Sequence, residues 1–163
     1  MRRLFINTCL ATAMLFGTAH AGFAAEKQKY FFMFFSNPVK GHEKDYLHWY
    51  TGQHIHDLLN IDGIVAAQFY ELGDQQFYGT HPQKYMMIWE IETTDLKSAF
   101  DRVKKGLATG TTVTKDSFLD NDTGNSMTFT PITNRVTQDE VLGKSVDQVR
   151  SIATEGQVTS ADN

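Results

Sequence analysis

The chain has 163 residues, with 15 lysines and arginines against 19 aspartates and glutamates, so its formal net charge at pH 7 is −4. An acidic chain without a dense run of basic residues is poorly suited to contact a phosphate backbone, so we expect no nucleic-acid partner. The one cysteine, Cys9, lies near the amino terminus, which leaves the rest of the chain without a disulfide, a thiol nucleophile or a thiolate metal ligand. The aromatic share of 12% favours an apolar ligand cavity or a large interface, although a large core also uses aromatic residues.

Residues 1–25 have the pattern of a secretory signal peptide. Arg2 and Arg3 form a short basic start, residues 4–16 are mostly apolar, and Ala19-His20-Ala21 matches the small-x-small motif of a cleavage site. The apolar run is too short for a membrane span of about 20 residues. The alternative is a buried N-terminal helix. We therefore expect a secreted, periplasmic protein without stable membrane insertion.

The remaining chain is predicted to form one domain at 26–136, followed by a polar tail at 137–163. About 140 residues are enough for one ordinary domain with its own core. Residues 154–163 have no core-forming pattern, so we expect them to be disordered. The few apolar residues earlier in the tail indicate a weak helix: Val141, Leu142, Val146 and Val149.

Six elements follow one another along the domain. Residues 30–35 (YFFMFF) form an uninterrupted apolar run, which predicts a strand buried on both faces. Apolar residues at helical spacing predict two helices, and Thr93-Thr94-Asp95 supplies an N-cap for the second. In chain order we expect a strand at 30–35, a helix from about residue 42 to residue 59, strands at 64–72 and 85–91, a helix at 96–107 and a strand at 125–132.

This order predicts an α+β fold of the ferredoxin-like βαββαβ type, with a four-stranded antiparallel sheet and two helices on one face. The strands at 30–35 and 85–91 have apolar residues pointing both ways, so the face without helices needs a cover. The simplest cover is a second copy packed sheet against sheet, a homodimer that forms a dimeric α/β barrel. The polar loop at 108–124 is long for a connection without structure of its own, and it fits a lid or an interface element.

The first predicted helix carries most of the candidate chemistry. Leu47, Tyr50, His54 and Leu58 fall on one stripe of a regular helix, and Tyr46, Trp49, Gln53 and Asp57 fall on the stripe beside it. Residues two apart on a regular helix point about 200° apart, so His54 and His56 cannot share one ion. We therefore expect no metal site.

The pattern of this helix and its flanks also occurs in a known family. The residues that carry the resemblance are Ser36-Asn37-Pro38, Gly41, Trp49-Tyr50, His54, Asp57-Leu58-Leu59, Gly63 and Ala67-Gln68. They resemble the dimeric α/β-barrel superfamily, and most of all its EthD-like branch, over residues 30–135. The resemblance implies a homodimer with a cavity between sheet and helices in each subunit. Members include cofactor-free monooxygenases, polyketide cyclases, muconolactone isomerases, haem-binding enzymes and proteins without a known activity.

His54 is the candidate catalytic residue, because it matches the helix histidine of that family and a histidine in a partly dry cavity can carry a proton near neutral pH. The alternative is a structural histidine held by a buried hydrogen bond. Aromatic residues with polar groups would position an oxygenated ligand, or else pack the dimer interface. For Asp57 the alternative to a positioning role is a surface salt bridge. The candidate substrate-binding residues are Tyr46, Trp49, Tyr50, Asp57 and Tyr85.

These observations lead to a functional hypothesis with two alternatives. We expect an exported protein that binds a small apolar or aromatic, oxygenated molecule and acts on it without a cofactor, as a cyclase, isomerase, lyase or oxygenase. The first alternative is a non-catalytic ligand-binding or stress-related module that uses the same cavity. The second is a haem-binding protein, with the helix histidine as the iron ligand.

Overall fold

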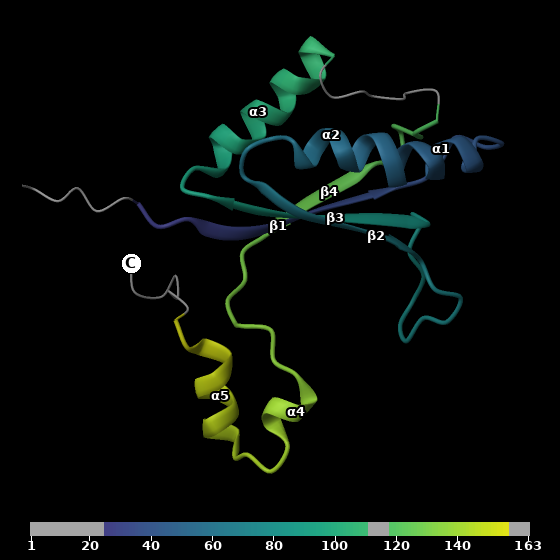
Figure 1. Ribbon diagram of the computed structural model, residues 1–163. Coiled ribbons are helices and arrows are strands. Elements are labelled where there is room, and N and C mark those ends of the chain that lie inside the picture. Colours follow the sequence, from purple (N-terminus) through teal and green to yellow (C-terminus); the bar gives the residue numbers. More distant parts are fainter. Residues whose placement is uncertain (1–24, 111–117, 157–163) are drawn as a thin grey trace, which may run out of the picture.

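In the computed structural model, which describes residues 25–110 and 118–156, four strands form one antiparallel sheet (Figure 1). The strand order is β2-β3-β1-β4, so the first and third strands lie in the centre. The helices of the βαββαβ unit cover one face, and the predicted ferredoxin-like α+β fold is confirmed. The predicted signal segment lies outside the described residues, apart from its last residue. The strands are β1 (Gln28–Ser36), β2 (Ile64–Glu71), β3 (Tyr85–Thr93) and β4 (Asn125–Phe129).

The pairing of β1 with β3 sorts the side chains of the sheet into two sets. Phe32 lies opposite Trp89 and Met33 lies opposite Ile88, and successive side chains of a strand point to opposite faces. Trp89 is buried under the helices, whereas Ile88 on the other face is only partly covered. We call this second face the open face. Its apolar side chains are Phe31, Met33, Phe35, Tyr70, Met86, Ile88, Met127 and Phe129.

The first helical segment is not the regular helix that the sequence predicts. It consists of α1 (Glu43–Trp49), a π-helical turn η1 (Tyr50–His54) and α2 (Ile55–Leu59). A π-helical turn has more residues than an α-helical turn, so it changes which side chains face the sheet. The most buried side chains therefore come from both predicted stripes, with Tyr46 and Tyr50 almost fully buried and Gln53 exposed. The prediction of one regular helix is therefore wrong at the π-helical turn, whereas Tyr50 and Leu58 of the first predicted stripe are buried.

The second helix, α3 (Leu96–Thr109), follows the sequence prediction closely. Asp95 caps its start by accepting a hydrogen bond from the backbone N–H of Ser98, at 3.0 Å. Gly110 ends it with φ of 73°, a left-handed conformation that glycine adopts without a steric penalty. Of the predicted loop at 108–124, residues 111–117 lie outside the described part of the chain.

The carboxyl-terminal part differs from the prediction in two respects. β4 ends at Phe129 and not at residue 132, because Pro131 lacks the N–H that a paired strand donates. Two helices, α4 (Gln138–Val141) and α5 (Val146–Thr154), replace the single weak helix, and Gly143 with φ of 73° lies between them. We call residues 130–156 the C-terminal arm. The predicted disorder beyond residue 156 lies outside the described residues.

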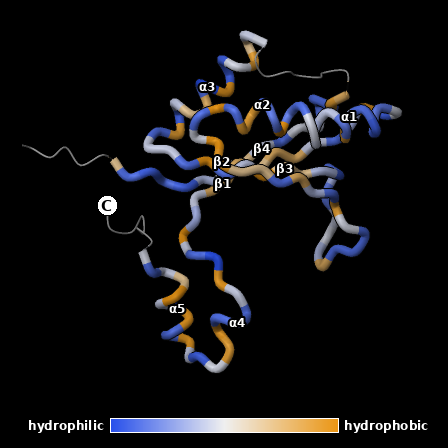
Figure 2. The backbone as a smooth tube through the Cα atoms, in the orientation of Figure 1, coloured by the Kyte–Doolittle hydropathy of each residue, from blue (hydrophilic) through white to orange (hydrophobic). Residues whose placement is uncertain are grey.

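The C-terminal arm lies on the open-face side of the sheet, opposite α1, α2 and α3 (Figure 1). Figure 2 shows hydrophobic residues along the strands of the sheet and a separate group in α4 and α5. Within residues 25–110 and 118–156, no helix has the length and apolar character to cross a membrane.

Two glycines near the first helical segment are expected to respond to alanine in opposite directions. Gly63 has φ of +94°, and a Cβ there would lie 3.2 Å from Arg102 Nη2, so Gly63→Ala should destabilise the fold by about 1–2 kcal/mol. Gly52 is helical and a Cβ added there would meet nothing within 4 Å, so Gly52→Ala should stabilise the fold by about 0.5–1 kcal/mol. Urea unfolding of both variants measures the two changes. Equal effects of the same sign would contradict these backbone assignments.

Candidate functional site

The predicted site residues Tyr46, Trp49, Tyr50 and Tyr85 come together in one cluster of rings between the first helical segment and the sheet. The Tyr50 ring stacks on Phe69 from β2, with centroids 4.7 Å apart and planes within 9°. Phe69 in turn stacks on Tyr85 at 5.5 Å, and Tyr46 lies 5.3 Å from Tyr85. Such stacked and tilted contacts stabilise beyond the burial of area alone. We call these five rings, with Trp89, the aromatic cluster.

One buried hydrogen bond joins the aromatic cluster to the end of β1. The Ser36 and Tyr46 hydroxyls lie 2.7 Å apart, and both side chains are fully shielded from solvent. Burial raises the pKa of Tyr46 and of Tyr50 well above the ordinary tyrosine value, so both phenols stay protonated. They can therefore donate a hydrogen bond but cannot serve as anionic bases.

His54 lies against the aromatic cluster on the π-helical turn. Its imidazole ring is 4.4 Å from the Trp49 ring, 4.9 Å from Tyr50 and 5.6 Å from Trp89, measured between centroids. Burial lowers the pKa of His54 to about 4, against the opposing effect of the Asp57 charge. The imidazole is therefore neutral at pH 7.

Two polar atoms in this region have no hydrogen-bond partner among the described residues: Nδ1 of His54 and Nε1 of Trp49. Both atoms are shielded from bulk solvent. A buried polar atom without a partner costs about 1–3 kcal/mol. The alternative role for His54 was a structural histidine held by a buried hydrogen bond. Within the described part of the chain, its Nδ1 makes no such bond.

Asp57 lies one turn beyond His54 and is 8% exposed. Its carboxylate accepts a hydrogen bond from Gln53 Nε2 and lies 3.4 Å from the Nδ1 of His56. The His56 side chain itself is 74% exposed, so this pair is buried on one side only. The negative charge of Asp57 favours the protonated form of His54. This places a buried carboxylate where it can stabilise an imidazolium.

The other histidines of the segment do not join this group. His48 and His56 both point to solvent. Over the described residues, no group of three histidine, cysteine, aspartate or glutamate side chains is arranged to hold a metal ion.

Sequence reasoning did not single out Ser36 or Phe69 as members of this site. Ser36 ends a strand in which Phe32 and Phe34 alternate towards the helices, so period-two alternation would have placed its hydroxyl on the buried face. Phe69 occupies the corresponding position in β2, opposite Met87. The pairing register that brings both residues beneath the helix comes from contacts between distant parts of the chain.

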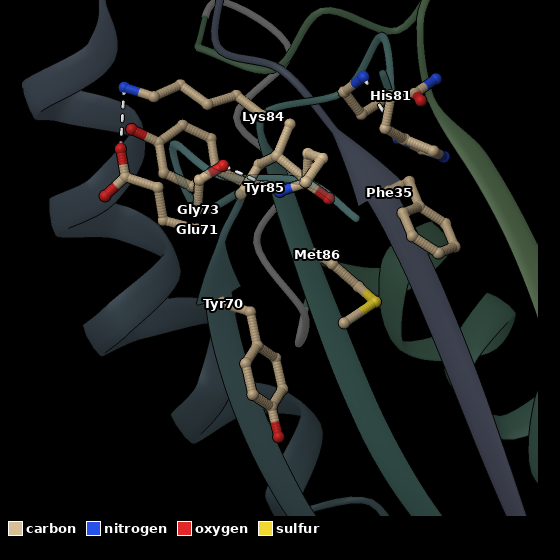
Figure 3. A pocket seen from close by; sticks show the side chains of 11 residues that line it. Phe35, Tyr70, Glu71, Gly73, His81, Lys84, Tyr85 and Met86 are labelled. Atoms are coloured by element: carbon tan, nitrogen blue, oxygen red, sulfur yellow. Dashed lines mark hydrogen bonds and ion pairs between the residues drawn. The ribbon is translucent and has the colours of Figure 1, made fainter. Parts of the chain in front are cut away.

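A separate pocket of about 340 Å³ lies on the open face, where β1 and β2 end and β3 begins (Figure 3). Phe35, Tyr70 and Met86 line it from three neighbouring strands, and the His81 ring packs 4.9 Å from Phe35. An ion pair between Lys84 and Glu71, at 2.9 Å, lies at its edge. The sequence does not predict this pocket, because the pocket forms where a corner of the sheet meets the connecting loop.

No protein-family model matches the chain, and no curated protein matches it. Among solved structures, it is similar to a protein from Shewanella loihica PV-4 described as a "putative monooxygenase". The identity is 12% and the TM-score is 0.41, over 69% of this chain and 97% of that one. The fold assignment made above rests on the strand order and the helix placement of this chain itself.

Removing the Ser36 hydroxyl should destabilise the fold by about 1–3 kcal/mol, because it leaves the Tyr46 hydroxyl buried without a partner. Urea unfolding of Ser36→Ala measures this loss. Adding Tyr46→Phe to Ser36→Ala removes the orphaned hydroxyl and should recover part of the stability. A Ser36→Ala variant as stable as the unchanged protein would show that this hydrogen bond contributes nothing.

The pKa of His54 predicts a specific pH dependence of stability. The unfolded imidazole titrates near 6.5 and the folded one near 4, so between these values the unfolded state binds more protons. The free energy of unfolding should therefore fall as the pH drops from 6.5 towards 4. Below pH 4, His54 should cause no further loss of stability. The shift corresponds to about 3 kcal/mol, since one pKa unit is about 1.4 kcal/mol.

His54→Phe should remove this component and keep a ring of similar size, whereas His56→Phe is the matched control because His56 is exposed. Unfolding free energies at several pH values between 4 and 7 measure the difference from the unchanged protein. An identical pH dependence in His54→Phe and His56→Phe would contradict the low pKa of His54.

Proposed function

We propose that the protein is an exported enzyme that acts, without a cofactor, on a small, partly apolar molecule bearing a carbonyl or hydroxyl oxygen. His54 carries the proton, and the aromatic cluster positions the substrate. The observation that supports this proposal is the pair of buried, unpartnered polar atoms, His54 Nδ1 and Trp49 Nε1, at one edge of the cluster. Native proteins pair nearly all buried polar groups, so an exception marks a candidate functional position.

The two atoms define the chemistry of the ligand that would satisfy them. The indole Nε1 is a donor only, so its partner must be an acceptor such as a carbonyl or enolate oxygen. The imidazole Nδ1 donates or accepts according to its tautomer. The rings around them favour a flat, apolar ligand body. Both atoms are shielded, so ligand entry requires the π-helical turn to open, and such turns occur often at functional sites.

The proposed first step is proton abstraction from carbon next to the substrate carbonyl. Neutral His54 takes the proton, and the electron pair of the broken C–H bond forms an enolate whose oxygen accepts the hydrogen bond of Trp49. A pKa of about 4 makes the free imidazole a weak base, so the reaction depends on the enolate and the Asp57 carboxylate stabilising the imidazolium. Return of the proton to a different atom completes an isomerisation. The same first step serves a cyclase, lyase or oxygenase.

The homodimer belongs to this proposal. The open face exposes apolar side chains, with Met127 at 40% and Phe129 at 46% exposure on its edge strand. A contiguous apolar face of this kind marks an interaction surface. A second copy packed sheet against sheet would cover it and close the dimeric α/β barrel that the resemblance implies. Export follows from the pattern of residues 1–25, and membership of the EthD-like branch from the helix motif.

A non-catalytic binding module is the second candidate, and the low pKa of His54 favours it. A base with a pKa of about 4 is poorly matched to neutral pH, since general-base catalysis is most efficient when the two are close. The same pair of polar atoms would then recognise a ligand oxygen without proton transfer. Haem fits these residues less well, because the rings of Trp49, Tyr50 and Trp89 pack against the imidazole of His54.

A thermal-shift screen of aromatic ketones, quinones and hydroxylated aromatics tests the proposal. A ligand of the site should stabilise the unchanged protein and the His56→Phe control, and both should convert it to product. His54→Phe should bind the compound but lose about 10²–10⁴-fold in turnover. Full turnover by His54→Phe would refute the role of His54. Binding without product in every variant would favour the binding module, and a Soret band on haem addition would favour haem.

A further inference from the structure

The C-terminal arm has a well-specified local structure. At α4, the side chain of Thr137 and that of Glu140 form a capping box, and at α5 Ser145 and Gln148 do the same. Asn134 closes the far end of α5, because its side-chain Nδ2 donates to the carbonyl oxygens of residues 152 and 155, at 3.0 Å and 2.9 Å. The sequence of the arm therefore encodes one particular helical hairpin.

This hairpin nevertheless leaves three of its apolar side chains exposed. Ile132 is 72% exposed, Leu142 67% and Val146 75%. Helices of four and nine residues are too short to be stable alone in water, so they depend on packing against something else. Within residues 25–110 and 118–156, the sheet and the helices α1, α2 and α3 do not provide that packing, because the arm projects away from them (Figure 1).

A second exposed apolar element lies on the same side of the sheet. The loop between β2 and β3, residues 72–84, also projects from the open-face side (Figure 1). It carries Phe77 at 91% exposure and Tyr78 at 87%, with their rings in contact at 4.7 Å. The pocket of Figure 3 lies beside this loop, lined by Gly73 and Gln76. The open face thus has a pocket at one corner, and the loop beside it exposes two aromatic side chains.

The arm and the pocket occupy opposite corners of the open face. The arm begins where β4 ends, and Phe129 pairs with Phe31 in the first half of β1. The pocket lies at the other end of β1, at Phe35, and towards the other edge strand, β2. In a face-to-face dimer the arm of one copy extends past its own sheet onto the side where the open face of the partner, with its pocket, would lie (Figure 1). Each symmetric dimer would then make this contact twice.

We propose that the C-terminal arm of each subunit docks on a second copy of the chain, with Leu142 and Val146 packed into the partner's pocket and against its exposed loop aromatics. The occupant is a second copy because the pocket, the loop and the arm all present apolar side chains on the side of the sheet that the proposed homodimer would cover. This inference rests on the proposed homodimer and adds the exchange of arms. The exchange closes the pocket only in the dimer.

Crosslinking between singly substituted subunits tests the contact. In a Cys9→Ser background, which removes the one natural cysteine, Val146→Cys and Gln76→Cys chains are refolded together and treated with a short bis-maleimide. The proposal expects a covalent dimer from the mixture. The matched control pairs Val146→Cys with Lys97→Cys, whose side chain is 85% exposed on the helix side of the sheet, and should give none. The absence of a crosslink between residues 146 and 76 of different chains would overturn the proposal. A crosslink that forms only within one chain carrying both cysteines would also overturn it.

Sedimentation equilibrium provides a second, independent measurement. Leu142→Asp and Val146→Asp should each weaken the dimer by about tenfold or more, because burying an apolar side chain of this size has that effect on affinity. Val146 begins α5, where a negative charge favours the helix, so Val146→Asp leaves the arm itself folded. Leu107→Asp on α3, 38% exposed, is the control and should not change the dimer.

The outcomes separate this proposal from the one on which it rests. If the unchanged protein is a monomer, the homodimer and the arm exchange fail together. If the unchanged protein is a dimer, and Leu142→Asp and Val146→Asp have the same dimer dissociation constant as the unchanged protein, only the arm exchange is overturned. Circular dichroism of each variant shows that the fold is retained.

Discussion

The antiparallel pairing of β1 with β3 is the constraint on which the rest of the structure depends. These two strands lie in the centre of the sheet and both are apolar on both faces. The register assigns Phe32, Phe34 and their partners to the helices and Phe31, Met33 and Phe35 to the other side. A one-residue slip would exchange the two sets. The buried site and the open face both follow from this assignment.

The π-helical turn determines how the first helical segment meets this sheet. By changing the angular position of the residues after Trp49, it brings Trp49, Tyr50 and His54 into one group of rings. A regular helix would separate them onto two stripes. The arrangement leaves one nitrogen of His54 and one of Trp49 without a hydrogen bond in the described residues. These two unpaired nitrogens lower the stability of the fold, and a ligand oxygen that accepts a hydrogen bond would remove that loss.

The two faces of the sheet therefore carry different features. On the helix side, tight ring packing and the Ser36–Tyr46 hydrogen bond hold the candidate site in place. On the open side, the pocket, the loop aromatics and the C-terminal arm all expose apolar surface that a monomer leaves in water. The proposed catalysis and the proposed assembly therefore use opposite faces of the same four strands.

The sequence by itself determined the order of elements, the ferredoxin-like fold and the segment that carries the candidate site. Apolar runs, apolar residues at helical spacing and a cap at Asp95 are local signals, so they can be read without distant contacts. The aromatic residues Tyr46, Trp49, Tyr50 and Tyr85 could be named from their types and positions, and His54 from the resemblance to a known family. Only the tertiary structure decided that Ser36 and Phe69 complete the cluster, that the helix contains a π turn, and that a pocket forms beside the loop at 72–84. Each of these depends on which distant residues pack together, and side-chain packing across the sheet outweighs the local preference for a regular helix.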